Sequence, residues 1–305
     1  MNLTGLHLLL SYQCTLECDH CFAWGSPSQT GTMSPEDIDL ILEQAGEMGG
    51  ISWIYFEGGE PFLYYAVLLK AVRAAARQGF LVGIVTNGYW ANSAASCLEN
   101  LRPFAGLLQD LTISSDPLHW GAEYRRRAGY IEQAAQELGL PLGEIAIAEP
   151  TAPDACSSAG MLAPGEDAIL YRGRAAVRLA AGRPGKNWEA FTTCPHEDLR
   201  EPGRVHLDPL GYVHICQGIT LGNIHGARLA EICDHYQPEA HPVCGPLLAG
   251  GPAELVRRYN LPLAGALADA CHLCYTARSL LRTRFPEALG PGQMYGEYVA
   301  VSPGS

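Results

Sequence analysis

The chain has few charged residues and no long apolar run. Charged residues make up 17% of its 305 residues and hydrophobic residues 48%, which excludes intrinsic disorder, because disordered chains are charge-rich and apolar-poor. No segment approaches the roughly 20 uninterrupted apolar residues of a transmembrane helix. The apolar run at residues 6–10 is too short for a signal peptide and has no preceding basic residue. These absences predict a cytoplasmic protein with no membrane partner.

Basic residues are also scarce. Lys and Arg together number 20, against 32 Asp and Glu, and the formal net charge is −12. An acidic chain repels the phosphate backbone of DNA and RNA, and no stripe of basic residues reverses this effect locally. We therefore expect no nucleic-acid partner.

Cysteine, by contrast, is abundant. The chain has 11 cysteines, an odd number, and no export signal. A reducing compartment disfavours a framework of disulfides, so clustered thiols there indicate metal or redox chemistry.

Strand and helix patterns alternate through the first half of the chain. We expect strands at 6–10, 51–56, 80–86, 108–114 and 144–148, a sixth strand at 175–179, and helices at 35–48, 63–78, 91–101 and 122–138. Alternation with short connections predicts an α/β fold with a parallel sheet and right-handed crossovers.

The pattern changes after about residue 185, where cysteines recur and prolines become more frequent. Residues 204–207 and 212–215 predict a β-hairpin that turns at an Asp-Pro-Leu-Gly sequence. We therefore expect a first domain over 1–185, a smaller second domain over 186–285, and a C-terminal tail over 286–305.

Three cysteines lie just after the first expected strand, at Cys14, Cys18 and Cys21. Three thiolates can bind one 4Fe-4S cluster and leave its fourth iron without a protein ligand. A structural zinc site would need a fourth protein ligand, although a zinc loop remains an alternative for this motif alone.

The spacing of these cysteines resembles the signature of radical S-adenosylmethionine (radical SAM) enzymes. A Gly58-Gly59-Glu60-Pro61 segment ends the second expected strand and is similar to a segment found at that place in the family. Paired glycines allow close approach of a ligand to the main chain, and a carboxylate suits an ammonium group. The resemblance covers roughly residues 6–180. It implies a partial (β/α)6 TIM-type barrel that binds a 4Fe-4S cluster and S-adenosylmethionine.

The resemblance also implies which residues hold the cofactor. The methionine amino group would be bound by Gly58, Gly59, Glu60 and Pro61, and Asn87 would end the third strand at the site. The ribose and the carboxylate would be contacted by Ser114 and Asp116. The adenine would pack near His20.

A second set of cysteines lies downstream: Cys194, Cys216, Cys271 and Cys274. One cysteine on each side of the expected hairpin and a distant CxxC pair can meet in a four-thiolate site. The arrangement resembles the twitch domain, a shortened SPASM domain that follows the barrel in some radical SAM enzymes. It implies a second, auxiliary 4Fe-4S cluster in a small C-terminal domain.

Three alternatives remain open for these thiols. A four-thiolate zinc site would use the same kind of hairpin and CxxC pair. Cys233 or Cys244 could replace one of the four ligands. Cys156, in a loop after the fifth expected strand, could donate a hydrogen atom to a substrate radical or have a passive role.

The resemblance implies reductive cleavage of S-adenosylmethionine to methionine and a 5′-deoxyadenosyl radical, which abstracts a hydrogen atom from the substrate. A flavodoxin- or ferredoxin-type protein would supply the electron. We expect modification of a peptide or protein side chain. A dehydrogenase or mutase acting on a small polar metabolite, such as an aminocyclitol or a sugar, is the first alternative. A non-catalytic iron–sulfur or zinc protein is the second.

Overall fold

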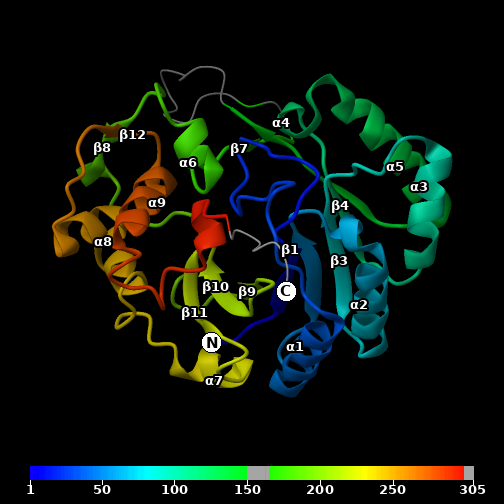
Figure 1. The fold of residues 1–305 in the computed structure, drawn as a ribbon, viewed down its shortest axis with the longest axis horizontal. Coiled ribbons are helices and arrows are strands. Elements are labelled where there is room, and N and C mark those ends of the chain that lie inside the picture. The colour runs from blue at the N-terminus through cyan, green and yellow to red at the C-terminus, as the bar shows by residue number, and fades with distance from the viewer. Residues whose placement is uncertain (150–161, 163–164, 299–305) are drawn as a thin grey trace, which may run out of the picture.

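An eight-stranded sheet forms the centre of the molecule (Figure 1). The computed structural model describes residues 1–149, 162 and 165–298. The strands run in the order β11-β10-β9-β1-β2-β3-β4-β5, and the six from β9 to β5 in that order are mutually parallel. Their bounds are β1 Gly5–Ser11, β2 Trp53–Gly58, β3 Leu81–Thr86, β4 Asp110–Ser114, β5 Leu142–Ile145, β9 Arg204–Leu207, β10 Tyr212–Cys216 and β11 Ile219–Asn223.

Helices connect the parallel strands and cover one side of the sheet, while the C-terminal helices α8 and α9 lie at the opposite side of the molecule (Figure 1). The helices are α1 Pro35–Met48, α2 Tyr65–Arg77, α3 Ala94–Leu101, α4 Pro117–Trp120, α5 Tyr124–Leu138, α6 Arg174–Arg178, α7 Leu229–His235, α8 Cys244–Tyr259 and α9 Ala270–Leu281. Two small sheets pair β6 (Ile147–Ala148) with β7 (Asp167–Ala168) and β8 (Lys186–Asn187) with β12 (Ala266–Leu267). None of the described helices has the length and apolar character that crossing a membrane requires.

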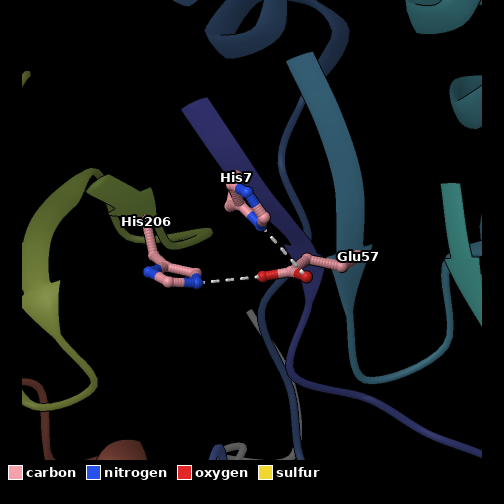
Figure 2. A group of neighbouring side chains, drawn as sticks. All are labelled: His7, Glu57 and His206. Carbon is pink, nitrogen blue, oxygen red and sulfur yellow. Dashed lines mark ion pairs between the residues drawn. The ribbon is translucent and has the colours of Figure 1, made fainter. Parts of the chain in front are cut away.

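The two faces of the sheet differ in character because successive side chains of a strand point in opposite directions. Along β1, the leucines at positions 6, 8 and 10 are buried against the helices. The alternate positions face the other way and are more polar. His7 of β1, Glu57 of β2 and His206 of β9 lie together on this second face (Figure 2).

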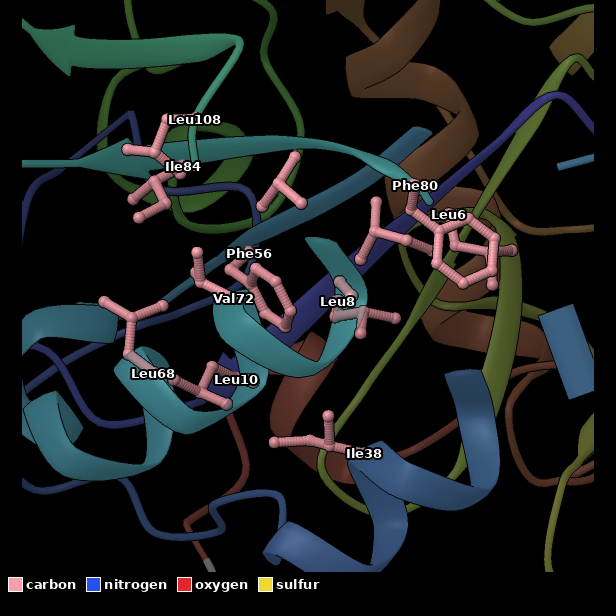
Figure 3. Packing of buried hydrophobic residues seen from close by; sticks show 14 of the residues in the cluster. Leu6, Leu8, Leu10, Ile38, Phe56, Leu68, Val72, Phe80, Ile84 and Leu108 are labelled. Atoms are coloured by element: carbon pink, nitrogen blue, oxygen red, sulfur yellow. The ribbon is translucent and has the colours of Figure 1, made fainter. Parts of the chain in front are cut away.

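The main hydrophobic core lies between the sheet and the helices α1 and α2 (Figure 3). Leu8 and Phe56 come from neighbouring strands and are fully buried there, with Ile38 from α1 and Leu68 from α2. Burial of apolar side chains on this scale is the principal force that holds helices against a sheet. The same core extends to Val205, on the far side of β1.

The expected α/β fold with a parallel sheet is confirmed, and so is the hairpin, which is formed by β9 and β10. The expected strand at 175–179 is wrong, because these residues lie mainly in the short helix α6. Gly173 precedes this helix with a φ of 60°, and the Arg174 amide donates a hydrogen bond to the Cys21 carbonyl. This tertiary contact favours a helical turn over an extended strand. The sixth parallel strand is instead β9, which pairs with β1.

The described part of the C-terminal tail returns to the first strand. A 3-10 turn at Gly292–Tyr295 places Met294 in a buried cluster with Leu9 and Tyr12. The Tyr295 hydroxyl donates a 2.7 Å hydrogen bond to the Gly218 carbonyl. This 3-10 turn therefore packs against the chain segment that leads from β1 into the first cysteine motif.

The core packing generates a stability prediction. Replacing Phe56 by alanine should lower the free energy of unfolding by about 3–5 kcal/mol, since the side chain is fully buried and leaves a cavity. Val177→Ala is the control, because its side chain is 59% exposed and its loss should change stability by no more than about 0.5 kcal/mol. Urea unfolding followed by circular dichroism measures both. Equal stability of the two variants would contradict this description of the core.

Candidate functional site

The cysteine motif after β1 lies at the wall of a large cavity. Cys14, Cys18 and Cys21 all line this cavity, which has a volume of about 540 Å³. The carboxyl ends of β2, β3 and β4 contribute Gly59, Asn87 and Ser114 to the same cavity, together with others. Ligand sites in folds built from parallel strands lie at this end of the sheet. The structure therefore brings together the segments that the sequence singled out.

Backbone and side-chain N–H groups point at two of the three sulfur atoms. The Leu16 amide donates to Cys14 Sγ at 3.4 Å, and the Gly25 amide donates to Cys21 Sγ at 3.3 Å. The side-chain amide of Asn87 also donates to Cys14 Sγ, at 3.4 Å. Hydrogen bonds to cysteine sulfur are one of the means by which proteins adjust iron–sulfur clusters.

Burial makes the thiolate form of these cysteines unfavourable without a metal. It raises the pKa of Cys14 to about 12, and it raises the pKa of Cys18 well above the usual range with the help of the neighbouring thiols. A metal centre supplies the positive charge that stabilises buried thiolates. The donor chemistry of the three cysteines therefore fits a cluster of iron and sulfide.

Arg174 fixes the loop that carries the three cysteines. The side chain is 1% exposed, and its guanidinium donates at 2.8 Å to the carbonyl of Cys18 and at 2.8 Å to the carbonyl of Gly25. Gly173 allows the close approach, because a Cβ atom there would lie 2.5 Å from the Phe22 carbonyl oxygen. Two chain segments more than 140 residues apart are thereby joined.

The two glycines after β2 allow this segment to pack directly on the cysteine loop. A Cβ atom at Gly59 would lie 2.0 Å from the Gln13 carbonyl oxygen, and Gly58 has a φ of 122°, which disfavours other residues. The Gly59 amide donates to the Ser11 carbonyl at 2.6 Å. Both glycines line the large cavity, where their backbone is open to a ligand.

Glu60 lies behind the wall of the cavity and is fully buried. Its carboxylate accepts hydrogen bonds from the Phe62 amide at 3.0 Å, the Thr86 hydroxyl at 2.8 Å and the Asn87 amide at 2.8 Å. Burial raises the pKa of Glu60 to about 7, although these hydrogen bonds oppose the shift. Pro61 follows it at the start of a 3-10 turn. The contacts position the end of β3, and binding of an amino group by Glu60 stays a prediction.

Asp116 and His119 form a polar pair at the end of β4. Asp116 begins the short helix α4, and each of its carboxylate oxygens lies 2.9 Å from His119 Nδ1. The His119 ring makes an edge contact with the ring of His20 at 4.5 Å, and both histidines line the large cavity. Burial and, to a smaller extent, the nearby His119 lower the pKa of His20 to about 4, so the ring is neutral at pH 7. The assigned roles of Ser114, Asp116 and His20 stay predictions.

His119 is a cavity residue that sequence reasoning left without a role. Its signal is its position three residues after Asp116, within the first turn of a helix that Asp116 caps. Phe22 and His196 also line the cavity. No local sequence pattern predicts this, because their place in the cavity wall depends on contacts between segments that are far apart in the chain.

The four downstream cysteines come together. Cys194, Cys216, Cys271 and Cys274 line one enclosed pocket between β10, α9 and the loop before β9. Burial raises the pKa of Cys271 above its usual range and that of Cys274 to about 11. Four converging thiols fit a cluster or a metal ion held by protein ligands alone.

The remaining described cysteines do not line the pocket of these four thiols. Cys233 is buried in the main core, where it packs as a small apolar side chain. Cys244 is buried among the C-terminal helices, in the same cluster as Cys216 and Cys274, so its replacement of one ligand stays an alternative. Cys97 is fully buried on α3. Cys156 lies outside the described residues, so its expected role as a hydrogen donor stays a prediction.

Arg172 lies between the two groups of cysteines and lines both cavities. Its guanidinium lies 3.5 Å from Glu197 and 3.9 Å from Cys216 Sγ on one side, and 5.5 Å from the centre of the Phe22 ring on the other. His196 also lines both cavities. The two thiol sites are therefore neighbours that share a wall.

Residues 8–119 match the family described as the Radical SAM superfamily. This stretch, a little over a third of the chain, is similar to a Radical SAM superfamily domain. The matched stretch begins at Leu8 within β1 and continues past β4, and it includes the first cysteine motif and the Gly58–Pro61 segment. The matched family implies a 4Fe-4S cluster and S-adenosylmethionine, and the donor set of Cys14, Cys18 and Cys21 fits such a cluster.

Two curated relatives resemble the radical SAM region. A putative peptide biosynthesis protein, YydG of Bacillus subtilis (strain 168), is 31% identical over 111 residues, which are 36% of this chain and 35% of the relative. A tungsten-containing aldehyde ferredoxin oxidoreductase cofactor-modifying protein of Pyrococcus furiosus is 33% identical over 111 residues, 36% of this chain and 30% of that protein. The alignment thus covers about a third of each relative.

Two solved structures share the fold over a longer stretch. BtrN in complex with AdoMet and 2-DOIA superposes with a TM-score of 0.53 and 18% identity, covering 77% of this chain and 83% of that one. Streptococcus suis SuiB bound to S-adenosylmethionine gives a TM-score of 0.53 and 12% identity, covering 84% of this chain and 75% of that one. At these identities the likeness shows the fold alone.

The contacts of Arg174 generate a prediction for the radical SAM cluster. Arg174→Ala leaves two buried carbonyls without their donor, which should destabilise the loop by about 2 kcal/mol and increase its opening about thirtyfold. We expect the reconstituted variant to lose iron to a chelator correspondingly faster. Arg178→Ala is the matched control, because Arg178 is exposed on the same short helix. Equal rates of iron loss from the two variants would contradict the role of Arg174.

Proposed function

We propose that this protein is a radical SAM enzyme that modifies a peptide or protein side chain with the help of one auxiliary 4Fe-4S cluster. The observation that carries the proposal is the meeting of Cys14, Cys18 and Cys21 with Gly58 and Gly59 at one cavity of about 540 Å³. When bound, the cluster and S-adenosylmethionine supply reductive cleavage to a 5′-deoxyadenosyl radical, which abstracts a substrate hydrogen atom. A flavodoxin- or ferredoxin-type protein would deliver the electron.

The residues of the chain would hold and orient the cofactor. Arg174 fixes the cysteine loop, and Gly58 and Gly59 leave the main chain open to the methionine end of the cofactor. Asn87 and Ser114 line the cavity further along the sheet, where they would contact the nucleoside. The neutral ring of His20 would pack against the adenine, and apolar groups such as Leu170 would exclude water from the radical.

The auxiliary cluster would be held by Cys194, Cys216, Cys271 and Cys274 in a domain over 186–285, next to a barrel domain over 1–185 and a tail over 286–305. Two arginines beside these cysteines, one buried and one half-buried, support a cluster with negative charge. Arg278 is 2% exposed, and Tyr295 followed by the thiols of Cys274 and Cys216 raises its pKa despite burial. Arg172 lies 3.9 Å from Cys216 Sγ. Buried cations require such partners, because an unpaired charge inside a protein is costly.

The substrate class rests on the relatives and on the cavity. The Bacillus subtilis relative is named a putative peptide biosynthesis protein. Beyond the region proposed for the cofactor, the cavity is lined by Asp167, Arg172 and His196, which are suited to a polar or charged substrate. The Pyrococcus furiosus relative is named a cofactor-modifying protein, and this supports the second candidate, a small polar metabolite.

Removing the first cysteine set should abolish the proposed chemistry. A variant with Cys14→Ala, Cys18→Ala and Cys21→Ala should lose all cleavage of S-adenosylmethionine and keep about four irons of the roughly eight expected in two clusters. Anaerobic reconstitution, iron and sulfide analysis, and chromatography of 5′-deoxyadenosine measure these quantities. Cys97→Ala is the control, because Cys97 is buried in the main core and should leave both quantities unchanged. Cleavage by the triple variant would refute the assignment of the first cluster.

The same triple variant tests the second thiol site. The remaining iron should be accompanied by an equal amount of labile sulfide, since a cubane contains both. Zinc without labile sulfide would show that Cys194, Cys216, Cys271 and Cys274 form a structural zinc site instead.

Isotope transfer tests the substrate class. We expect deuterium to move into 5′-deoxyadenosine from a peptide labelled at carbon, and mass spectrometry detects this transfer. Labelled aminocyclitols and sugars are the comparison. Transfer from these molecules and not from peptides would favour the small-metabolite alternative.

A further inference from the structure

Two histidines and a glutamate form a polar cluster on the second face of the sheet, apart from both groups of cysteines. His7, Glu57 and His206 come from the adjacent strands β1, β2 and β9 (Figure 2). His7 of β1 and His206 of β9 lie directly opposite each other in the parallel pairing of these two strands. On the other side of β1, His7 lies opposite Tyr55 of β2, and Glu57 follows two residues after Tyr55. Their side chains are 20%, 13% and 7% exposed for His7, Glu57 and His206 respectively.

The distances in this cluster are long for hydrogen bonds between charged groups. His7 Nδ1 lies 3.4 Å from Glu57 Oε2, and His206 Nε2 lies 3.3 Å from Glu57 Oε1. Charge-assisted hydrogen bonds are about 2.7–2.9 Å long. Each separation is close to the roughly 3.3 Å between two ligand atoms bound at about 2.05 Å to one tetrahedral ion. The two distances end on different oxygens of Glu57, Oε2 and Oε1.

Some polar atoms in this cluster lack hydrogen-bond partners among the residues that the structure describes. Within residues 1–149, 162 and 165–298, neither His7 Nδ1 nor Glu57 Oε1 has a hydrogen-bond partner, although both atoms are buried. One ligand atom from each of the three residues can be chosen so that all lie within 4.8 Å of one another. The side-chain amide of Gln217 lies 3.4 Å from His206 Nε2 and adds a fourth polar group.

The protonation states favour a cation. Burial lowers the pKa of His206 to about 3, so its ring is neutral. A metal ion at Nε2 would take the place of the Gln217 amide as the partner of this nitrogen. Burial raises the pKa of Glu57, but the two imidazole rings lower it by more, so the carboxylate is ionised. A neutral imidazole and a carboxylate are typical ligands of Zn²⁺ and Fe²⁺.

We propose that His7, Glu57 and His206 bind one divalent transition-metal ion, Zn²⁺ or Fe²⁺, at a site separate from both cysteine groups. The ion would join β1 and β2 to β9, a strand almost 200 residues later in the sequence. A cleft of about 300 Å³, lined by His7, Tyr55 and Arg204 among others, provides a path from solvent. Glu57 also lines the large cavity, so the site lies next to the space proposed for the substrate.

Zinc binding to the cluster-loaded protein tests this inference. The anaerobically reconstituted protein would be dialysed against low-micromolar Zn²⁺, and zinc, iron and labile sulfide counted per chain. We expect one zinc per chain with no loss of iron or sulfide. X-ray absorption at the zinc edge should show nitrogen and oxygen neighbours at about 2.0–2.1 Å and no sulfur at about 2.3 Å.

Two ligand variants and one control assign the ion to its ligands. His7→Ala and Glu57→Gln should each weaken zinc binding by at least about 100-fold, since even residues that only orient metal ligands change affinity by 10–100-fold. His7 is the most exposed of the three side chains, which makes His7→Ala the mildest change to the core. His225→Ala is the matched control, because His225 is an exposed histidine 3.9 Å from a carboxylate, and zinc binding should be unchanged.

The outcomes are distinguishable from those that test the proposed enzyme activity, because the count of bound zinc does not require S-adenosylmethionine cleavage. Absence of the extra zinc, or equal binding by all variants, would overturn the proposal. Sulfur neighbours in the absorption spectrum would place the ion at the cysteines and would also overturn it.

Discussion

The parallel pairing of β1 on both of its edges is the constraint on which the rest of the structure depends. β2 pairs with one edge of β1 and β9 with the other, so segments 200 residues apart become neighbours in one sheet. Loops at the carboxyl ends of these strands then meet, and the first cysteine motif comes to lie against the Gly58–Gly59 segment. The β9–β10 hairpin places Cys216 on the same side of the molecule as α9.

Three arginines, two of them fully buried, connect distant segments of the chain around the cysteine sites. Arg174 donates to two carbonyls of the cysteine loop, Arg278 donates to the Gln217 carbonyl at 2.8 Å, and Arg172 lies between the two thiol cavities. Each cation requires acceptors or negative charge in return for leaving water. Their positions therefore connect the stability of the fold to the sites that would hold clusters.

Much of the site could be predicted from the sequence, because its signals are local. The spacing of Cys14, Cys18 and Cys21 and the paired glycines before Glu60 depend on short segments that take their conformation from nearby residues. The wrong expectation at 175–179 has the opposite cause. There, contacts of Arg174 with the cysteine loop outweigh a weak local preference for an extended strand.

The sequence by itself determined the alternation of strands and helices, the first thiol motif and the hairpin, because apolar periodicity and turn residues act over a few positions. Only the tertiary structure decided that β9 pairs with β1, that Arg172 is shared by two cavities and that His7, Glu57 and His206 converge. These features come from long-range strand pairing and from the burial of charge. Both depend on residues far apart in the chain, which no local pattern connects.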